Sequence, residues 1–245
     1  MMAIKPKKTS IITKRVSSAL SISTFVMQNS TESVAERITA YQKAGINCLP
    51  ALGKKAIPLG RPKAPEGGSR KLLIIRQNAA DYSRILKSAP KSIGIFCGIT
   101  CGIEALDFDQ IEAFEAFLKF AKKAGLEALT RRIAKGYEER TPRGIHWLYR
   151  INLKTQLAFP SNQRWATAEG KPIIETRGQG GYCITAPSWN NIYRQTQGGP
   201  GSIVTIDWEE REQLRSIGAM LGDSEPTSVT TKPTIRKKTR RRPTN

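Results

Sequence analysis

The architecture of this chain follows from one segment, IEALDFD at residues 103–109. Its first part is apolar except for Glu104, and it closes on two aspartates, Asp107 and Asp109. On a strand alternate side chains share a face, so these carboxylates point the same way, roughly 7 Å apart. The next segment, Glu112–Ala124, carries apolar residues on one side at helical spacing and stops at Gly125. A strand that leads through two acids into an amphipathic helix indicates an α/β (α+β) protein with an acidic site.

The two aspartates have two interpretations. Neighbouring carboxylates repel each other unless a cation lies between them, and hard oxygen ligands suit Mg²⁺ or Mn²⁺. Alternatively, Asp109 caps the helix that follows it, because aspartate is a favoured N-cap residue. The pair alone does not decide between a metal site and a helix cap.

Helix and strand patterns alternate along the rest of the chain. Ser33 and Glu36 have the spacing of a capping box, which predicts a first helix that ends before Gly45. Strands are predicted at Ile46–Leu49, Ile93–Cys97, Ile103–Phe108, Ile145–Ile151, Ile173–Thr176 and Tyr182–Thr185, and further helices at Ala79–Ser88 and Trp208–Leu221. Glycine turns at 98–102 and 178–181 predict that the strands flanking each turn pair as a hairpin.

A second motif, TPRGIH, ends in the only histidine of the chain, His146. Arg143 and Gly144 precede it, and an arginine beside a glycine would permit close approach of a phosphate. Taken alone, a single histidine on a strand is more often a structural residue than a catalytic one.

The third motif is IIETRGQGGY, at residues 173–182. Glu175 and Arg177 share a strand face, so a carboxylate and a guanidinium would lie together. Taken alone, the motif is also compatible with a surface salt bridge followed by a glycine turn.

Charge indicates the kind of partner. The chain has 40 Lys and Arg against 20 Asp and Glu, a net charge of +20. Residues 32–222 alone retain 28 basic and 18 acidic residues, a net charge of +10. A basic folded domain favours a phosphate-bearing partner, because neutralised phosphates release counterions.

The composition divides the chain into a basic Ser/Thr-rich segment 1–31, a folded domain 32–222 and a disordered basic tail 223–245. Residues 1–31 have three interpretations: an organelle-targeting segment, a solvated basic tail, or a segment left untranslated when translation starts at Met27. The scattered cysteines are expected to be packed thiols in a reducing cytosol, with no zinc site. No apolar stretch has the length of a membrane span, and we expect a cytoplasmic, nucleoid-associated protein.

The ordered motifs resemble the primase-polymerase domain of the archaeo-eukaryotic primase superfamily, as in bifunctional DNA primase/polymerases of plasmids, phages and integrated elements. They run from a hydrophobic strand with DxD, through TPRGxH, to an acid before RGxGGY and then APS. YQKAGINCLPALGKKAIP, at 41–58, resembles the opening helix, strand and lysine-bearing loop of that family. SIGIFCGITCGIEALDFD, at 92–109, resembles the strand pair that leads to its metal aspartates. The resemblance covers about residues 34–221.

The resemblance implies an RRM-like catalytic core with a small N-terminal α/β module ahead of it. It implies that Asp107, Asp109 and Glu175 bind two Mg²⁺ or Mn²⁺ ions and that His146 binds the triphosphate of the incoming nucleotide. These four would be the catalytic residues. Further phosphate neighbours would be Arg143, Arg177 and Ser188 and, as weaker candidates, Lys54 and Lys55.

The implied activity is template-dependent primer synthesis and DNA polymerisation from nucleoside triphosphates on single-stranded DNA, by two-metal phosphoryl transfer. Two alternatives remain: a non-catalytic nucleic-acid-binding replication subunit with the same fold, and a two-metal nuclease. The intact set of acids with His146 argues against the first, and the triphosphate-binding residues argue against the second. The sequence contains no Walker P-loop, so a separately encoded helicase is a candidate partner.

Overall fold

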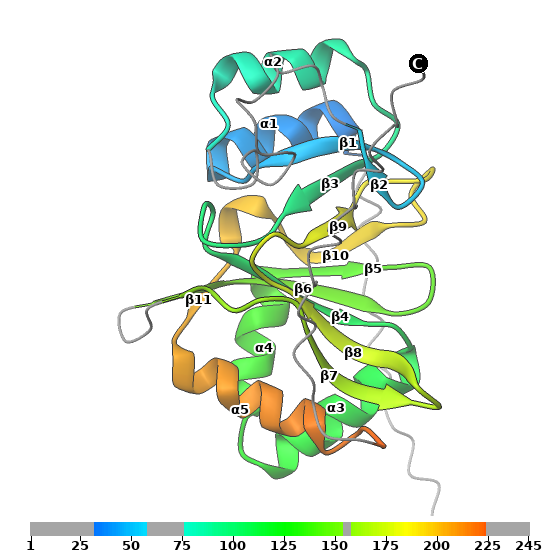
Figure 1. The fold of residues 1–245 in the computed structure, drawn as a ribbon, viewed down its shortest axis with the longest axis vertical. Helices are drawn as coiled ribbons and strands as arrows, with labels where there is room; N and C mark the ends of the chain where they lie inside the picture. Colours follow the sequence, from blue (N-terminus) through cyan, green and yellow to red (C-terminus); the bar gives the residue numbers. More distant parts are fainter. Residues whose placement is uncertain (1–31, 58–75, 154–157, 224–245) are drawn as a thin grey trace, which may run out of the picture.

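A computed structural model describes residues 32–57, 76–153 and 158–223 of the chain. Two sheets are stacked in it, and helices cover their outer sides (Figure 1). Helices and antiparallel strands are mixed throughout, which confirms the predicted α+β class. None of the helices in these residues is long and apolar enough to cross a membrane.

The smaller sheet belongs mostly to the N-terminal part of the chain. Its strand order is β2-β1-β3-β9, formed by β1 (Cys48–Leu52), β2 (Lys55–Ala56), β3 (Ile93–Phe96) and β9 (Tyr182–Thr185). Helices α1 (Val34–Ala44) and α2 (Ala79–Lys87) lie on its outer side (Figure 1). The predicted capping box opens α1, and Gly45 ends it in the left-handed conformation that favours glycine.

The larger sheet carries the segment at 103–109 in its interior. Its strand order is β10-β5-β6-β4-β8-β7, and all these pairs are antiparallel. The bounds are β4 (Ile103–Phe108), β5 (Tyr137–Arg140), β6 (Ile145–Ile151), β7 (Gln163–Ala168), β8 (Lys171–Arg177) and β10 (Arg194–Gly198). A short strand, β11 (Thr205–Ile206), runs parallel to the end of β6.

The two faces of the larger sheet have different neighbours. Phe108 and Trp147 pack into a core with the helices of one face, α3 (Ile111–Lys123), α4 (Glu127–Gly136) and α5 (Trp208–Ala219). Ala105, three residues before Phe108, and Leu148, next to Trp147, point to the other face and pack into a second core with Tyr41 and the smaller sheet. All four cysteines are buried in this second core, where packed thiols were expected. Alternation along each strand therefore places Asp107 on the face of the smaller sheet.

Both predicted hairpins are wrong. The chain leaves the smaller sheet after β3 and enters the larger one at β4, and it makes the reverse crossing between β8 and β9. The two glycine turns pack against each other: the Cys97 N–H donates to the Gly181 carbonyl at 2.9 Å. Gly98 has a φ of +126°, and a side chain there would meet Gln179 of the other turn. The turns are crossings between sheets because each supplies a hydrogen-bonding partner for the other.

Candidate active site

One row of polar side chains runs across the larger sheet. Glu139 lies directly opposite His146, His146 opposite Asp107, Asp107 opposite Glu175, and Glu175 opposite Arg164. Directly opposite residues have Cβ atoms about 4.5–5.5 Å apart, and like charges in such positions are destabilising. Acidic residues alternate with His146 and Arg164 except at one place, where Asp107 faces Glu175. A cation between these two carboxylates would relieve their repulsion.

Asp109 completes this acidic cluster. Ligand oxygens of Asp107, Asp109 and Glu175 all lie within 4.8 Å of one another. The alternative role of Asp109 as a helix cap is wrong, because Gln110 is the N-cap residue of α3 and its side chain makes no capping hydrogen bond. Three convergent carboxylates supply the hard oxygen ligands that Mg²⁺ and Mn²⁺ prefer, so the residues present fit such ions.

The two facing carboxyls differ in their electrostatic surroundings. Burial alone would raise the pKa of Asp107, but the attraction of His146, followed by that of Arg177 and Lys54, lowers it below its ordinary value. Burial is the main cause that raises the pKa of Glu175, and repulsion by the two aspartates adds to it, against the attraction of Arg177 and Arg164. In the metal-free protein the neighbouring cations therefore outweigh burial at Asp107, but they do not outweigh burial and repulsion at Glu175.

His146 is buried between two carboxylates. Its Nε2 lies 3.2 Å from Asp107 Oδ1 and its Nδ1 lies 2.8 Å from Glu139 Oε1. Burial acts to lower the pKa of His146, but Asp107 and Glu139 outweigh it and raise this pKa well above its ordinary value. The histidine is therefore held as a cation at the edge of the acidic cluster.

Glu139 is a residue of this site that sequence reasoning missed. Its side chain is fully buried. Besides His146, it accepts hydrogen bonds from the Tyr137 hydroxyl and from the Ala186 N–H, each at 2.7 Å. Arg37 of α1 donates in turn to the Tyr137 hydroxyl at 3.2 Å. The sequence YEER, at 137–140, gave no signal for it, because apolar and polar residues do not alternate there and the pairing of Glu139 with His146 depends on the register of the strands.

Arginines flank the cluster on two sides. Arg143 donates to Asp109 at 2.8 Å, and Arg177 forms a short ion pair with Glu175. Gly144 differs from its expected role, because a Cβ there would stand against the Phe108 carbonyl oxygen. Its missing side chain lets the turn approach the end of β4, rather than a phosphate, and this approach brings Arg143 to Asp109.

The lysine-bearing loop is the turn between β1 and β2. Lys54 at its tip contributes to the lowered pKa of Asp107, so its charge acts on the acidic cluster. Lys55 is exposed and lies in β2, directly opposite Leu52 of β1. Of the two lysines, Lys54 is therefore the one whose charge reaches the acidic cluster.

Ser188 is buried, and its hydroxyl is hydrogen-bonded within the protein. It accepts from the Ile93 N–H at 2.9 Å and donates to the Ile93 carbonyl at 3.1 Å. Its backbone pairs with Tyr193, and Tyr193 packs against His146 with a distance of 6.0 Å between ring centroids. Ser188 therefore anchors the loop that places Tyr193 in the site. Tyr193 was also missed by the sequence analysis.

The opposite face of the sheet holds a buried ion pair. Arg211 of α5 donates to both oxygens of Glu104 on β4, at 2.8 and 2.9 Å, and both side chains are fully buried. The Tyr149 hydroxyl also donates to Glu104, at 2.7 Å. Because Glu104 precedes Ala105 on the strand, this pair points away from the acidic cluster and fastens α5 to the sheet.

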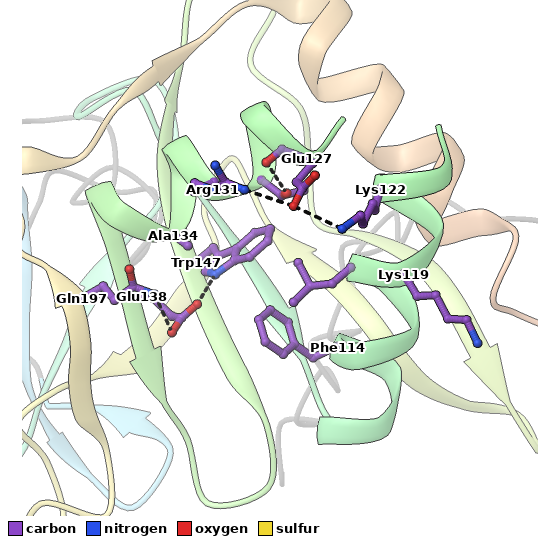
Figure 2. A pocket seen from close by; sticks show the side chains of 11 residues that line it. Phe114, Lys119, Lys122, Glu127, Arg131, Ala134, Glu138, Trp147 and Gln197 are labelled. Atoms are coloured by element: carbon purple, nitrogen blue, oxygen red, sulfur yellow. Dashed lines mark hydrogen bonds and ion pairs between the residues drawn. The ribbon is translucent and has the colours of Figure 1, made fainter. Parts of the chain in front are cut away.

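A cavity of about 600 Å³ also lies on the helix-covered face, between α3 and α4 (Figure 2). Phe114 and Trp147 form part of its apolar lining. At its rim Glu127 pairs with Arg131 at 3.0 Å and with Lys122 at 3.7 Å. Trp147 neighbours His146 on the same strand and points the other way, so the sheet separates this cavity from the carboxylates.

The comparison with known protein families agrees with this geometry. The family described as bifunctional DNA primase/polymerase, N-terminal, matches residues 38–219. No curated protein matches the chain. The match contains the acidic cluster, His146 and both sheets, and it spans well over half of the sequence. The chain therefore belongs to the family of bifunctional DNA primase/polymerase N-terminal domains.

Proposed function

We propose that the chain synthesises primers and extends them on a single-stranded DNA template, using nucleoside triphosphates and two divalent ions. The observation that carries this proposal is the placement of Asp107 opposite Glu175, with Asp109 completing a cluster of three carboxylates. Family membership supports DNA primase/polymerase chemistry of the nucleotidyl-transfer type. The cluster adds the residues at which that chemistry would take place.

The expected ligands of the ions are Asp107, Asp109 and Glu175. Bound Mg²⁺ or Mn²⁺ would activate the 3′-hydroxyl of the primer and neutralise the triphosphate and the leaving pyrophosphate. The protein itself supplies the rigid frame, because Asp107 and Glu175 lie on neighbouring strands in the interior of a sheet.

Cationic side chains around the cluster would hold the triphosphate. His146 is charged and fixed, and Arg177, Arg143 and Lys54 have charges directed at the carboxylates. Charge-assisted hydrogen bonds to phosphate are about twice as strong as neutral ones. When a nucleotide and ions are bound, these cations can exchange their carboxylate partners for phosphate oxygens.

A primer-synthesis assay tests the proposal. Purified protein is incubated with a single-stranded template, labelled nucleotides and Mg²⁺ or Mn²⁺, with and without a primer. Synthesis should be lost in Asp107→Asn, Asp109→Asn and Glu175→Gln and kept in Glu115→Gln, which removes an exposed acid of α3. Template degradation would select the nuclease instead, and binding without synthesis would select a non-catalytic replication subunit.

A further inference from the structure

The surroundings of Glu139 specify which atoms carry protons. Its Oε2 receives two hydrogen bonds, from the Tyr137 hydroxyl and from the Ala186 N–H, both at 2.7 Å. Its Oε1 lies 2.8 Å from His146 Nδ1. An ionised carboxylate only accepts hydrogen bonds, so the Nδ1 atom facing it must carry a proton. One proton is therefore held on Nδ1, the nitrogen that points away from the acidic cluster.

This arrangement also fixes the direction of the other ring nitrogen. With Nδ1 held by Glu139, the ring plane is set and Nε2 is directed at Asp107, 3.2 Å away. Glu139 is itself held in place, because one of its donors, the Ala186 N–H, belongs to the backbone. Its other donor, the Tyr137 hydroxyl, accepts a hydrogen bond from Arg37 of α1. A carboxylate behind a functional histidine commonly sets its tautomer and orientation in this way.

We propose that Glu139 is a positioning residue that holds His146 as an Nδ1–H donor and aims its Nε2 at the triphosphate of the incoming nucleotide. That Nε2 is directed at a triphosphate rests on the proposed function, whereas the placement of a proton on Nδ1 does not depend on it. Glu139 itself touches no substrate and acts only through His146.

Glu138 provides a matched control on the same strand. It is a buried carboxylate that accepts hydrogen bonds from Trp147 Nε1 at 2.9 Å and from the Thr196 hydroxyl at 2.8 Å. Because neighbouring residues on a strand point to opposite faces, it has no part in the row that contains His146. Glu138→Gln therefore removes a buried charge from β5 without touching the histidine.

Glu139→Gln has an effect that can be derived from its donors. The Tyr137 hydroxyl and the Ala186 N–H require the amide oxygen at their position. The amide NH₂ then faces His146 Nδ1 and donates to it, which excludes a proton there. The ring should become neutral with its proton on Nε2. The side chain keeps its size and its packing.

His146 is the only histidine of the chain, so the imidazole nitrogens can be observed directly by NMR of protein labelled with ¹⁵N-histidine. The wild-type spectrum should show a proton on Nδ1, Glu138→Gln should match it, and Glu139→Gln should show the neutral Nε2–H tautomer. A neutral Nε2–H ring in the wild type would overturn the proposal without any variant. An unchanged spectrum in Glu139→Gln would overturn it too.

Kinetics test the second part of the proposal. The nucleotide KM of Glu139→Gln should rise roughly three- to tenfold, because a charge-assisted contact becomes a neutral one, and kcat should change less. Glu138→Gln should leave KM unchanged. An equal KM in wild type and Glu139→Gln would overturn the positioning role. If the wild type makes no DNA, the proposed function fails, while the NMR spectra still decide whether Glu139 sets the tautomer.

Discussion

Asp107 and Glu175 lie directly opposite each other on β4 and β8, yet their carboxyl pKa values are shifted in opposite directions. The difference comes from the balance of burial and charge at each carboxyl. At Asp107 the attraction of the cationic His146 outweighs burial. At Glu175 burial and the repulsion of both aspartates outweigh the attraction of the neighbouring arginines. Removing one acid or the other should therefore change the stability of the metal-free protein in opposite senses.

In chelator at pH 7, Asp107→Asn should lower the free energy of unfolding by on the order of 1–3 kcal/mol, since it removes the partner of a buried cation. Glu175→Gln should raise it by up to about 1 kcal/mol, because the burial of this charge and its repulsion by the aspartates outweigh the ion pair with Arg177 that is lost. Because the pKa of Asp107 is lower in the folded than in the unfolded protein, its ionised carboxyl stabilises the folded state at pH values above the unfolded pKa, which is near 4. This stabilisation is lost as the pH falls through the folded pKa. A raised folded pKa has the reverse effect, so the cost of Glu175 appears as the pH rises above about 4.

Urea unfolding of both variants from pH 3 to pH 8 measures these differences. The two curves should diverge from wild type in opposite directions at neutral pH and converge with it at the acidic end. Destabilisation of similar size in both variants would show that Glu175 is not electrostatically frustrated in the metal-free state.

Divalent ions should stabilise the folded protein. An ion that binds only the folded state at a hundredfold excess over its Kd adds about 2.7 kcal/mol of stability. Addition of Mn²⁺ should therefore raise Tm in the wild type and in Glu115→Gln, and EDTA should reverse the shift. Asp109→Asn should lose most of it, because Asp109 supplies one of the three carboxylates. A full Mn²⁺ shift in Asp109→Asn would remove this residue from the metal site.

His146→Ala should weaken nucleotide use more than DNA binding. The lost contact is charge-assisted, and such contacts contribute about 1.5–3 kcal/mol, which corresponds to roughly ten- to a hundredfold in apparent nucleotide affinity. Steady-state kinetics measure the nucleotide effect, and anisotropy with a labelled template measures DNA binding. Unchanged nucleotide affinity and rate would make His146 a structural histidine.

The two aspartates of the acidic cluster were predictable because their signal is local, whereas Glu175 was assigned to it only through the family resemblance. Asp107 and Asp109 are separated by one residue on a strand, and this spacing alone places them on one face. The segment 103–109 also predicted β4 with its observed bounds. The capping box of α1 was predictable for the same reason, since Ser33 and Glu36 are three residues apart.

The predictions failed where the structure depends on distant parts of the chain. The glycine turns after β3 and β8 have the composition of hairpins, and they cross between sheets because they pack against each other. Strand β5 has the sequence YEER, and three charged residues in a row do not predict a strand. In the folded protein Glu138 and Glu139 are hydrogen-bonded to Trp147 and His146 on opposite faces of the sheet. The role of Ser188 likewise depends on Ile93, 95 residues away.

The Glu104–Arg211 pair should matter for stability alone. Both side chains are fully buried on the helix-covered face, and removing one partner leaves an uncompensated buried charge. Arg211→Met should lower the free energy of unfolding by about 3–5 kcal/mol, whereas Glu104→Gln combined with Arg211→Met should recover part of the loss. Thermal or urea unfolding measures both. With Glu104→Gln alone as the third variant, losses that simply add in the double variant would show that the two side chains are not energetically coupled.

The basic tail should contribute to DNA binding through charge alone. Residues 224–245 lie outside the described structure and contain seven basic residues and one acid among Thr and Pro. Asp223 accepts from the Glu169 N–H at 3.0 Å, and its own N–H donates to Thr167 at 2.8 Å, so a truncation should keep it. Each phosphate contact adds about 0.9 to the salt slope on duplex DNA.

Truncation after Asp223 should flatten that slope and reduce processivity. It should leave Tm and single-nucleotide addition at saturating DNA unchanged, and a tail of the same composition in scrambled order should restore the slope. Identical slopes for the full-length and truncated proteins would show that the tail does not touch DNA.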